Sequence, residues 1–135
     1  MTMGDKLFEE KGKMTTTFVD TIDANGIVMR QSFTSDVMGI GKFPSGTNMG
    51  SGTIHIDADN KGHGKWHGMM MTNDNDMIVW KGSGHSLRQK GDIKGIMVVT
   101  FMTKSEKYAW TNSIIVVKDI EATLMDFKIN AFEWK

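Results

Sequence analysis

The sequence predicts an all-β, single-domain protein built as an antiparallel up-and-down β-barrel of about eight strands. Apolar and polar residues alternate with a period of two over most of the chain. Fifteen glycines and a single proline favour tight turns between strands. The expected strands are joined mainly by short polar turns, whereas parallel strands would need long crossovers. Closure into a barrel removes the two free edges that an open sheet would leave.

The first two strands are expected over residues 14–22 and 27–35, around an Asn25-Gly26 turn in which both residues tolerate positive φ. Before them, residues 1–12 are charged, and we expect either a short helix plugging one end of the barrel or a flexible terminus. After them, alternation fails over residues 36–50, which hold several glycines and the proline. This segment is expected to be a long irregular connection.

The remaining strands follow at regular spacing. They are expected over residues 52–57, 64–72, 77–84, 92–103, 108–117 and 121–134. Polar turns at 59–62, 73–76 and 104–107, a polar loop at 86–91 and a weaker turn near 118–119 separate them. The chain of 135 residues is long enough for one hydrophobic core, which assigns residues 1–135 to one barrel domain.

Composition excludes several classes of function. Sixteen basic residues balance sixteen acidic ones, so no excess positive charge favours nucleic acid or an anionic membrane. The absence of cysteine excludes disulfides, a thiol nucleophile and cysteine-based metal sites. The apolar runs at 96–99 and 114–117 are too short to cross a bilayer, and no secretory signal is recognisable. We therefore expect a cytoplasmic protein with neither a nucleic-acid nor a membrane partner.

The segment 55–85 carries all four histidines and two of the four tryptophans. Lys65, His67 and Lys81 are costly to bury, so the alternate positions with Trp66 and Trp80 are expected to face the interior. The predicted lining of these two strands is Gly64, Trp66, Gly68, Met70, Ile78, Trp80, Gly82 and Gly84.

Pairs of glycines two residues apart, as at Gly50/Gly52 and Gly82/Gly84, put both members of a pair on one face of a strand. Two interpretations stay open. Inward glycines opposite large aromatic residues leave room for a small ligand, or they let strands coil and approach one another closely. The thirteen methionines likewise suit either an adaptable pocket or ordinary core filling.

Metal and catalytic motifs are weak. On a strand, His63 and His67 lie about 13 Å apart, too far for one ion. His55 and His85 lie on neighbouring strands, but exposed strand and turn histidines are the simpler interpretation. We therefore expect no metal site and no cofactor. No nucleophile elbow, phosphate-binding loop or zinc-protease motif occurs, and catalytic residues stay unknown.

The strand count, the glycine usage and the size resemble small calycin-like or allene-oxide-cyclase-like β-barrels over residues 13–134, in architecture only. The Gly-x-Trp signature near a lipocalin's first strand has no counterpart, because Gly64-Lys65-Trp66 lies in mid-chain. The resemblance implies an interior suited to a small apolar molecule.

We therefore predict a protein that binds a small hydrophobic molecule inside the barrel and is not an enzyme. The predicted ligand-binding residues are Trp66, Met70, Trp80, Phe101, Tyr108, Trp110 and Asn112. Asn112 or Tyr108 would orient the ligand. One alternative is an isomerase or cyclase that uses the same cavity and needs a polar group inside it. Another is a homo-oligomer or interaction module whose interface contains the outward Met69, Met71 and Val79.

Overall fold

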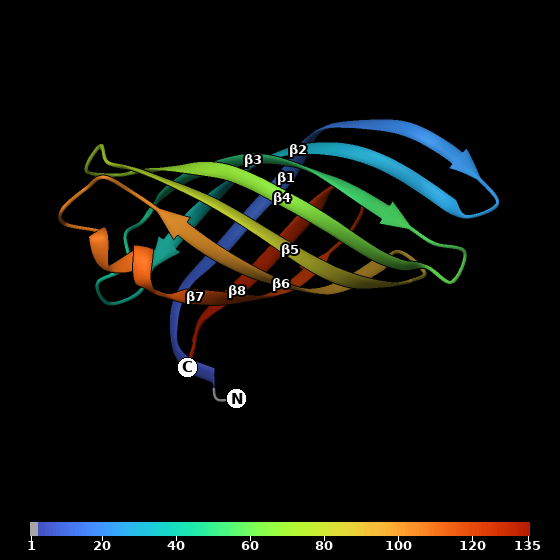
Figure 1. Ribbon diagram of the computed structural model, residues 1–135. Helices are drawn as coiled ribbons and strands as arrows, with labels where there is room; N and C mark the ends of the chain where they lie inside the picture. Colours follow the sequence, from blue (N-terminus) through green and yellow to red (C-terminus); the bar gives the residue numbers. More distant parts are fainter. Residues whose placement is uncertain (1–2) are drawn as a thin grey trace.

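The computed structural model of the protein describes residues 3–135 and shows a closed barrel of eight antiparallel strands in sequence order (Figure 1). The strands are β1 (Met3–Asp23), β2 (Gly26–Gly39), β3 (Gly46–Ile56), β4 (Lys61–Thr72), β5 (Met77–Gln89), β6 (Asp92–Met102), β7 (Ile115–Ala122) and β8 (Asp126–Trp134). The barrel closes where β1 pairs with β8 as well as with β2. The predicted all-β barrel and its number of strands are confirmed.

Alternation along the strands sorts side chains between the core and the outer surface. On β4 and β5, Trp80 is buried and Trp66 packs against the core, while Lys65, His67 and Lys81 are exposed. The predicted orientation of these two strands is therefore confirmed. The interior is rich in aromatic rings that meet around Phe33. Its ring centroid lies 5.8 Å from that of Trp66, 5.9 Å from that of Trp80 and 5.4 Å from that of Phe127.

The N-terminal segment is a strand, so the prediction of a helix or flexible terminus is wrong for residues 3–12; residues 1 and 2 lie outside the described part of the chain. This part of β1 pairs on both sides, with β2 and with β8. Its alternation is hidden in the sequence because two of its inward positions hold Glu10 and Gly12 in place of apolar residues. Pairing to two neighbours stabilises a strand that its own composition does not indicate.

The connection between β2 and β3 is shorter than predicted. The two strands together take in most of residues 36–50, and only residues 40–45 connect them. Here too the inward positions hold small or polar residues, Ser35 on β2 with Asn48 and Gly50 on β3, which removes the apolar signal of a strand. Strand β5 also extends to Gln89, through most of the predicted loop at 86–91.

The predicted strand over 108–117 is wrong for residues 108–114. Strand β6 ends at Met102, a short 3-10 helix η1 (Ala109–Ser113) follows, and β7 begins at Ile115. The side chain of Asn112 holds this connection in place, because its Oδ1 accepts a hydrogen bond from the Thr103 amide and its Nδ2 donates to the Thr103 carbonyl. The turn expected near 118–119 lies instead at 123–125, between β7 and β8. No helix in residues 3–135 has the length and apolar character needed to cross a membrane.

The two ends of the barrel differ. The hairpins β1–β2, β3–β4, β5–β6 and β7–β8 lie at one end, and the β1–β2 hairpin extends past the rest as an arm (Figure 1). The connections β2–β3, β4–β5 and β6–β7 lie at the other end, with both termini nearby (Figure 1). We call these the hairpin end and the terminal end.

Candidate functional site

The interior of the barrel contains a cavity of about 140 Å³ that extends toward the hairpin end. Its walls are mostly apolar and include Met14, Phe33, Trp66, Met97 and Ile129. A comparable cavity of roughly 150 Å³ lined by Leu, Ile and Phe stays dry and binds benzene. The volume therefore suits a molecule of about the size of one aromatic ring.

Some of the inward glycines face the indole rings at close range. A Cβ on Gly52 would lie 2.4 Å from Cδ2 of Trp66, and one on Gly68 would lie 2.7 Å from Cζ2 of Trp80. The space in front of these two glycines is therefore occupied by the tryptophans, which favours the close-packing interpretation there. Gly64 and Gly84 line the cavity, and a Cβ on Gly64 would lie 2.9 Å from Trp66 Nε1.

A buried network of charged and polar side chains borders the cavity. Lys118 Nζ lies 3.1 Å from Glu10 Oε1, and both side chains are almost completely buried. Ser35 Oγ and Asn48 Nδ2 donate to the other carboxylate oxygen of Glu10, and Trp80 Nε1 donates to Asn48 Oδ1 at 2.7 Å. These residues belong to β1, β2, β3, β5 and β7, so the network ties opposite walls of the barrel together.

The charge state of Glu10 follows from these contacts. Burial raises the pKa of its carboxyl group, but the Lys118 charge and the hydrogen bonds from Ser35, Asn48 and Lys118 together bring the pKa below its ordinary value. Glu10 is therefore ionised at neutral pH and paired with a cation. A general acid or base needs a pKa near the working pH, which this carboxylate does not have.

Sequence reasoning missed Glu10 and Lys118. Glu10 lies in the segment whose strand was not recognised, and Lys118 lies where a turn was expected. One signal was available. Counting back by twos from the inward Met14 reaches Gly12 and Glu10, which places Glu10 on the interior face once β1 is extended.

Two further polar side chains line the cavity and retain unused hydrogen-bonding capacity. The Gln31 amide bonds Thr17 through Nε2 at 3.2 Å, and within residues 3–135 nothing donates to its Oε1. If the amide is turned the other way, its nitrogen is the free end. Trp66 Nε1 likewise has no acceptor in the described part of the chain. No fully buried side-chain nitrogen or oxygen in the described part of the chain lacks a partner, so both atoms remain accessible from the cavity.

The structure divides the seven predicted ligand-binding residues. Trp66 and Trp80 line the cavity. Met70 and Phe101 are buried in the core, apart from the cavity lining. Three others, Tyr108, Trp110 and Asn112, lie in the connection between β6 and β7 at the terminal end.

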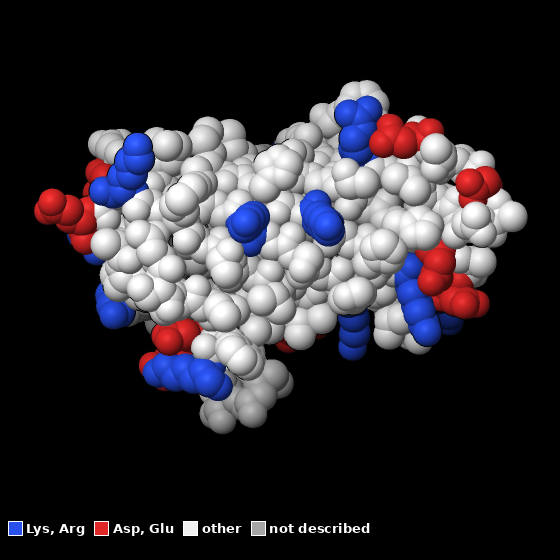
Figure 2. Space-filling model, viewed as in Figure 1, with Lys and Arg blue, Asp and Glu red and all other residues white. Residues whose placement is uncertain are grey.

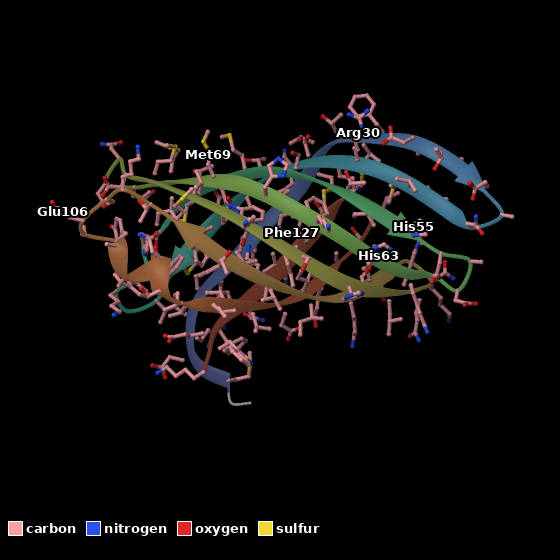
Figure 3. The ribbon with its side chains drawn as sticks, viewed as in Figure 1. Arg30, His55, His63, Met69, Glu106 and Phe127 are labelled. Atoms are coloured by element: carbon pink, nitrogen blue, oxygen red, sulfur yellow. The ribbon has the colours of Figure 1, made fainter. Side chains whose placement is uncertain are left out.

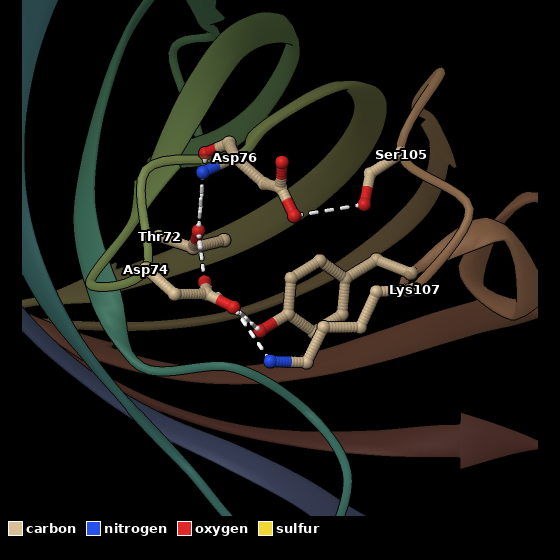
Figure 4. A network of polar contacts seen from close by, with 6 residues as sticks. Thr72, Asp74, Asp76, Ser105 and Lys107 are labelled. Carbon is tan, nitrogen blue, oxygen red and sulfur yellow. Dashed lines mark hydrogen bonds and ion pairs between the residues drawn. The ribbon is translucent and has the colours of Figure 1, made fainter.

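A polar network at the terminal end explains how Tyr108 is used (Figure 4). Asp74, in the β4–β5 turn, accepts hydrogen bonds from Tyr108 Oη at 2.9 Å, Lys107 Nζ at 2.7 Å and Thr72 Oγ1 at 2.6 Å. These hydrogen bonds, from Lys107 first, then Thr72 and Tyr108, hold the pKa of Asp74 far below its usual range. Ser105 Oγ also donates to Asp76, so the network joins the β4–β5 turn to the β6–β7 connection.

Aromatic side chains fill the same end of the barrel. The ring centroid of Phe43 lies 4.6 Å from that of Phe8 and 6.1 Å from that of Trp110. Packing of this kind leaves the cavity at the opposite half of the barrel, toward the hairpin end.

The outer surface carries both signs of charge. Figure 2 shows basic and acidic side chains interspersed on the visible face, with no continuous basic stripe across it. Met71 is exposed and Met69 and Val79 are partly exposed, and Met69 lies opposite Met49 across β3 and β4. These side chains lie on the outside of the barrel, as the sequence indicates.

No protein-family model matches the chain, and no curated protein sequence is similar to it. Solved structures with the same fold do exist. A protein of unknown function from Clostridium acetobutylicum ATCC 824 superposes with a TM-score of 0.86 at 15% identity, covering 98% of this chain and 97% of the other. A beta-barrel like protein from Acinetobacter baumannii AYE gives a TM-score of 0.85 at 13% identity, with 99% and 96% covered.

An enzyme from Penicillium herquei has a TM-score of 0.69 at 18% identity, with 97% of this chain and 96% of that chain covered. At such low identities the likeness concerns the fold alone. The chain is thus similar, over nearly its whole length, to solved barrels from bacteria and a Penicillium species.

Proposed function

We propose that the protein binds one small, mostly apolar molecule inside the barrel. The observation that carries this proposal is the cavity of about 140 Å³ with apolar walls, bordered by two polar side chains, Gln31 and Trp66, that retain free hydrogen-bonding capacity. Apolar burial supplies the affinity, and a hydrogen bond to either side chain orients the molecule.

The cavity favours a neutral ligand. Glu10 and Lys118 already neutralise each other at its border. A charged ligand would bring a further charge into a mostly apolar space, where the cost of desolvation is large. A single aromatic ring bearing a carbonyl or hydroxyl group matches both the volume and the free Trp66 N–H.

An isomerase or cyclase is the second candidate function, because it requires a polar group at the cavity and Glu10 with Lys118 meets that requirement. The similar fold of the Penicillium herquei enzyme is compatible with it. Binding without catalysis is better supported, since the two charges satisfy each other and the pKa of Glu10 is lowered.

Calorimetric titration with matched one-ring probes tests the proposal. Acetophenone and toluene are expected to bind the wild-type protein, acetophenone more tightly because its oxygen accepts from Trp66, and benzoate is expected not to bind. Trp66→Phe should remove the preference for acetophenone, about 1 kcal/mol for one hydrogen bond, while toluene still binds.

A variant that fills the cavity provides the second arm. Ala122 lines the cavity on β7, and the adjacent Glu121 is exposed on the outer face. Ala122→Phe should weaken binding of both neutral probes at least about tenfold, and Glu121→Phe should leave it unchanged. Absence of binding by every neutral probe, or equal loss in the two variants, would overturn the proposal.

A further inference from the structure

Three of the four histidines form one row across adjacent strands on the outer face of the barrel. His55 on β3 is the direct partner of His63 on β4, and His63 is in turn the partner of His85 on β5. Figure 3 shows His55 and His63 side by side near the hairpin end of their strands. His63 and His85 are exposed on the outer face of β4 and β5, and both residues also belong to the lining of the cavity.

The first two rings of this row have the spacing of a chelating pair. His55 Nδ1 lies 3.1 Å from His63 Nε2, and their ring centroids are 5.1 Å apart with the planes 78° to each other. Two nitrogens that bind one tetrahedral zinc ion at about 2.0–2.1 Å lie roughly 3.3 Å apart. When the proton between them moves to the far nitrogen of its ring and the rings reorient, both nitrogens present a lone pair to one ion.

The surroundings permit solvent to complete the coordination. His63 is exposed and His55 is half-buried, so an ion bound there keeps open positions for water. The Oδ1 atom of Asp57 accepts hydrogen bonds from the backbone amides of Asp59 and Lys61. His85 lies farther away, with its ring centroid 6.3 Å from that of His63. Among residues 3–135 no group of three or more potential ligands converges, so the pair supplies two ligands.

We propose that His55 and His63 bind a divalent late transition-metal ion, with Zn²⁺, Ni²⁺ and Cu²⁺ as the metals that imidazole pairs favour. Of these three ions, Cu²⁺ should bind with the highest affinity. Hard ions such as Mg²⁺ should not bind, because they prefer oxygen ligands. This replaces the expectation of no metal site. That expectation rested on the distance between His63 and His67 along one strand and on the interpretation of His55 and His85 as ordinary exposed histidines. The register between strands brings His55 to His63.

The test is a calorimetric titration of the wild-type protein and of three single variants with NiCl₂ and with ZnCl₂. One ion per chain is expected. His55→Ala and His63→Ala should each weaken binding at least about tenfold, since each removes one of the two imidazoles that chelate the ion.

His67→Ala is the matched control. His67 is an exposed histidine of the same strand, on the same face as His63, and its Nε2 lies 3.4 Å from Ser51 Oγ. It should retain wild-type affinity. Absence of binding by the wild-type protein, or a loss in His67→Ala equal to that in His63→Ala, would refute the site. All three positions are exposed or half-buried, and circular dichroism of each variant would verify that the barrel is intact.

Discussion

At the scale of single residues, the Glu10–Lys118 pair is the feature most dependent on its environment. Each charge would be costly to bury alone, and each is satisfied by the other together with Ser35 and Asn48. Lys118 Nζ also lies 4.8 Å from the Trp80 ring centroid, which adds a cation–π contact. The pair therefore stabilises one particular arrangement of the barrel walls.

Lys118→Met should lower the free energy of unfolding by about 3–5 kcal/mol, because it leaves the Glu10 carboxylate buried without a counter-charge. The double variant Glu10→Gln/Lys118→Met should lose less than Lys118→Met alone, since no charge is then orphaned. Urea denaturation monitored by tryptophan fluorescence measures both. The single variant Glu10→Gln completes the comparison. A loss in the double variant equal to the sum of the losses in the two single variants would contradict the pairing.

Asp74 gives a dependence on pH at the same scale. Its folded pKa lies below the unfolded value near 4, so its contribution to stability is present above about pH 4 and disappears as pH falls below that. The difference in stability between wild type and Asp74→Asn should therefore be largest above pH 4 and shrink in acid. Asp92→Asn, at an exposed aspartate that begins β6, serves as the control and should show no such difference. Thermal melts between pH 2.5 and 7 provide the comparison.

At the scale of elements, the strands of this barrel differ in how visible they are in the sequence. Strands β4 and β5 could be predicted because their outward lysines and inward tryptophans alternate. The first part of β1 could not, because Glu10 and Gly12 occupy inward positions. A strand whose inward positions hold polar residues, or glycines packed against an aromatic ring, lacks the apolar pattern by which strands are recognised.

Gly12 shows what such a position requires. A Cβ there would lie 2.5 Å from Phe127 Cζ, from Ser35 Cβ and from the Thr34 carbonyl oxygen. Gly12→Ala should therefore cost about 1–3 kcal/mol through overpacking between β1, β2 and β8.

Gly91, in the β5–β6 turn, has open space around its Cα and is the matched control. Gly91→Ala should change stability by less than about 0.5 kcal/mol. Chemical denaturation measures the free energy of unfolding of both variants. Equal decreases in the two variants would show that the crowding around Gly12 is relieved without cost.

At the scale of the whole molecule, the barrel is filled at its terminal end and hollow toward its hairpin end. The Asp74 network and the stacked rings of Phe43 and Phe8 occupy the terminal end, and the cavity lies toward the hairpin end. This asymmetry lets one end stabilise the fold while the other is available to a ligand.

A ligand that binds only the folded barrel must stabilise it. Acetophenone at about 100 times its dissociation constant should add about 2.7 kcal/mol and raise the melting temperature by a few degrees. The same concentration should have little effect on Ala122→Phe. Differential scanning fluorimetry measures the shift, and an equal rise in both proteins would indicate binding outside the cavity.

The sequence by itself determined the all-β class, the number of strands and the inward orientation of Trp66 and Trp80, because these depend on alternation within a single strand. Only the tertiary structure decided the Glu10–Lys118 pair and the contact between His55 and His63. It also decided that Tyr108 and Asn112 lie at the terminal end and not at the cavity. The first two depend on which residues of different strands lie opposite one another, and the third depends on the contacts that the β6–β7 connection makes with Thr103 and Asp74. Register is set by closure of the whole barrel, and no local pattern in the chain reports it.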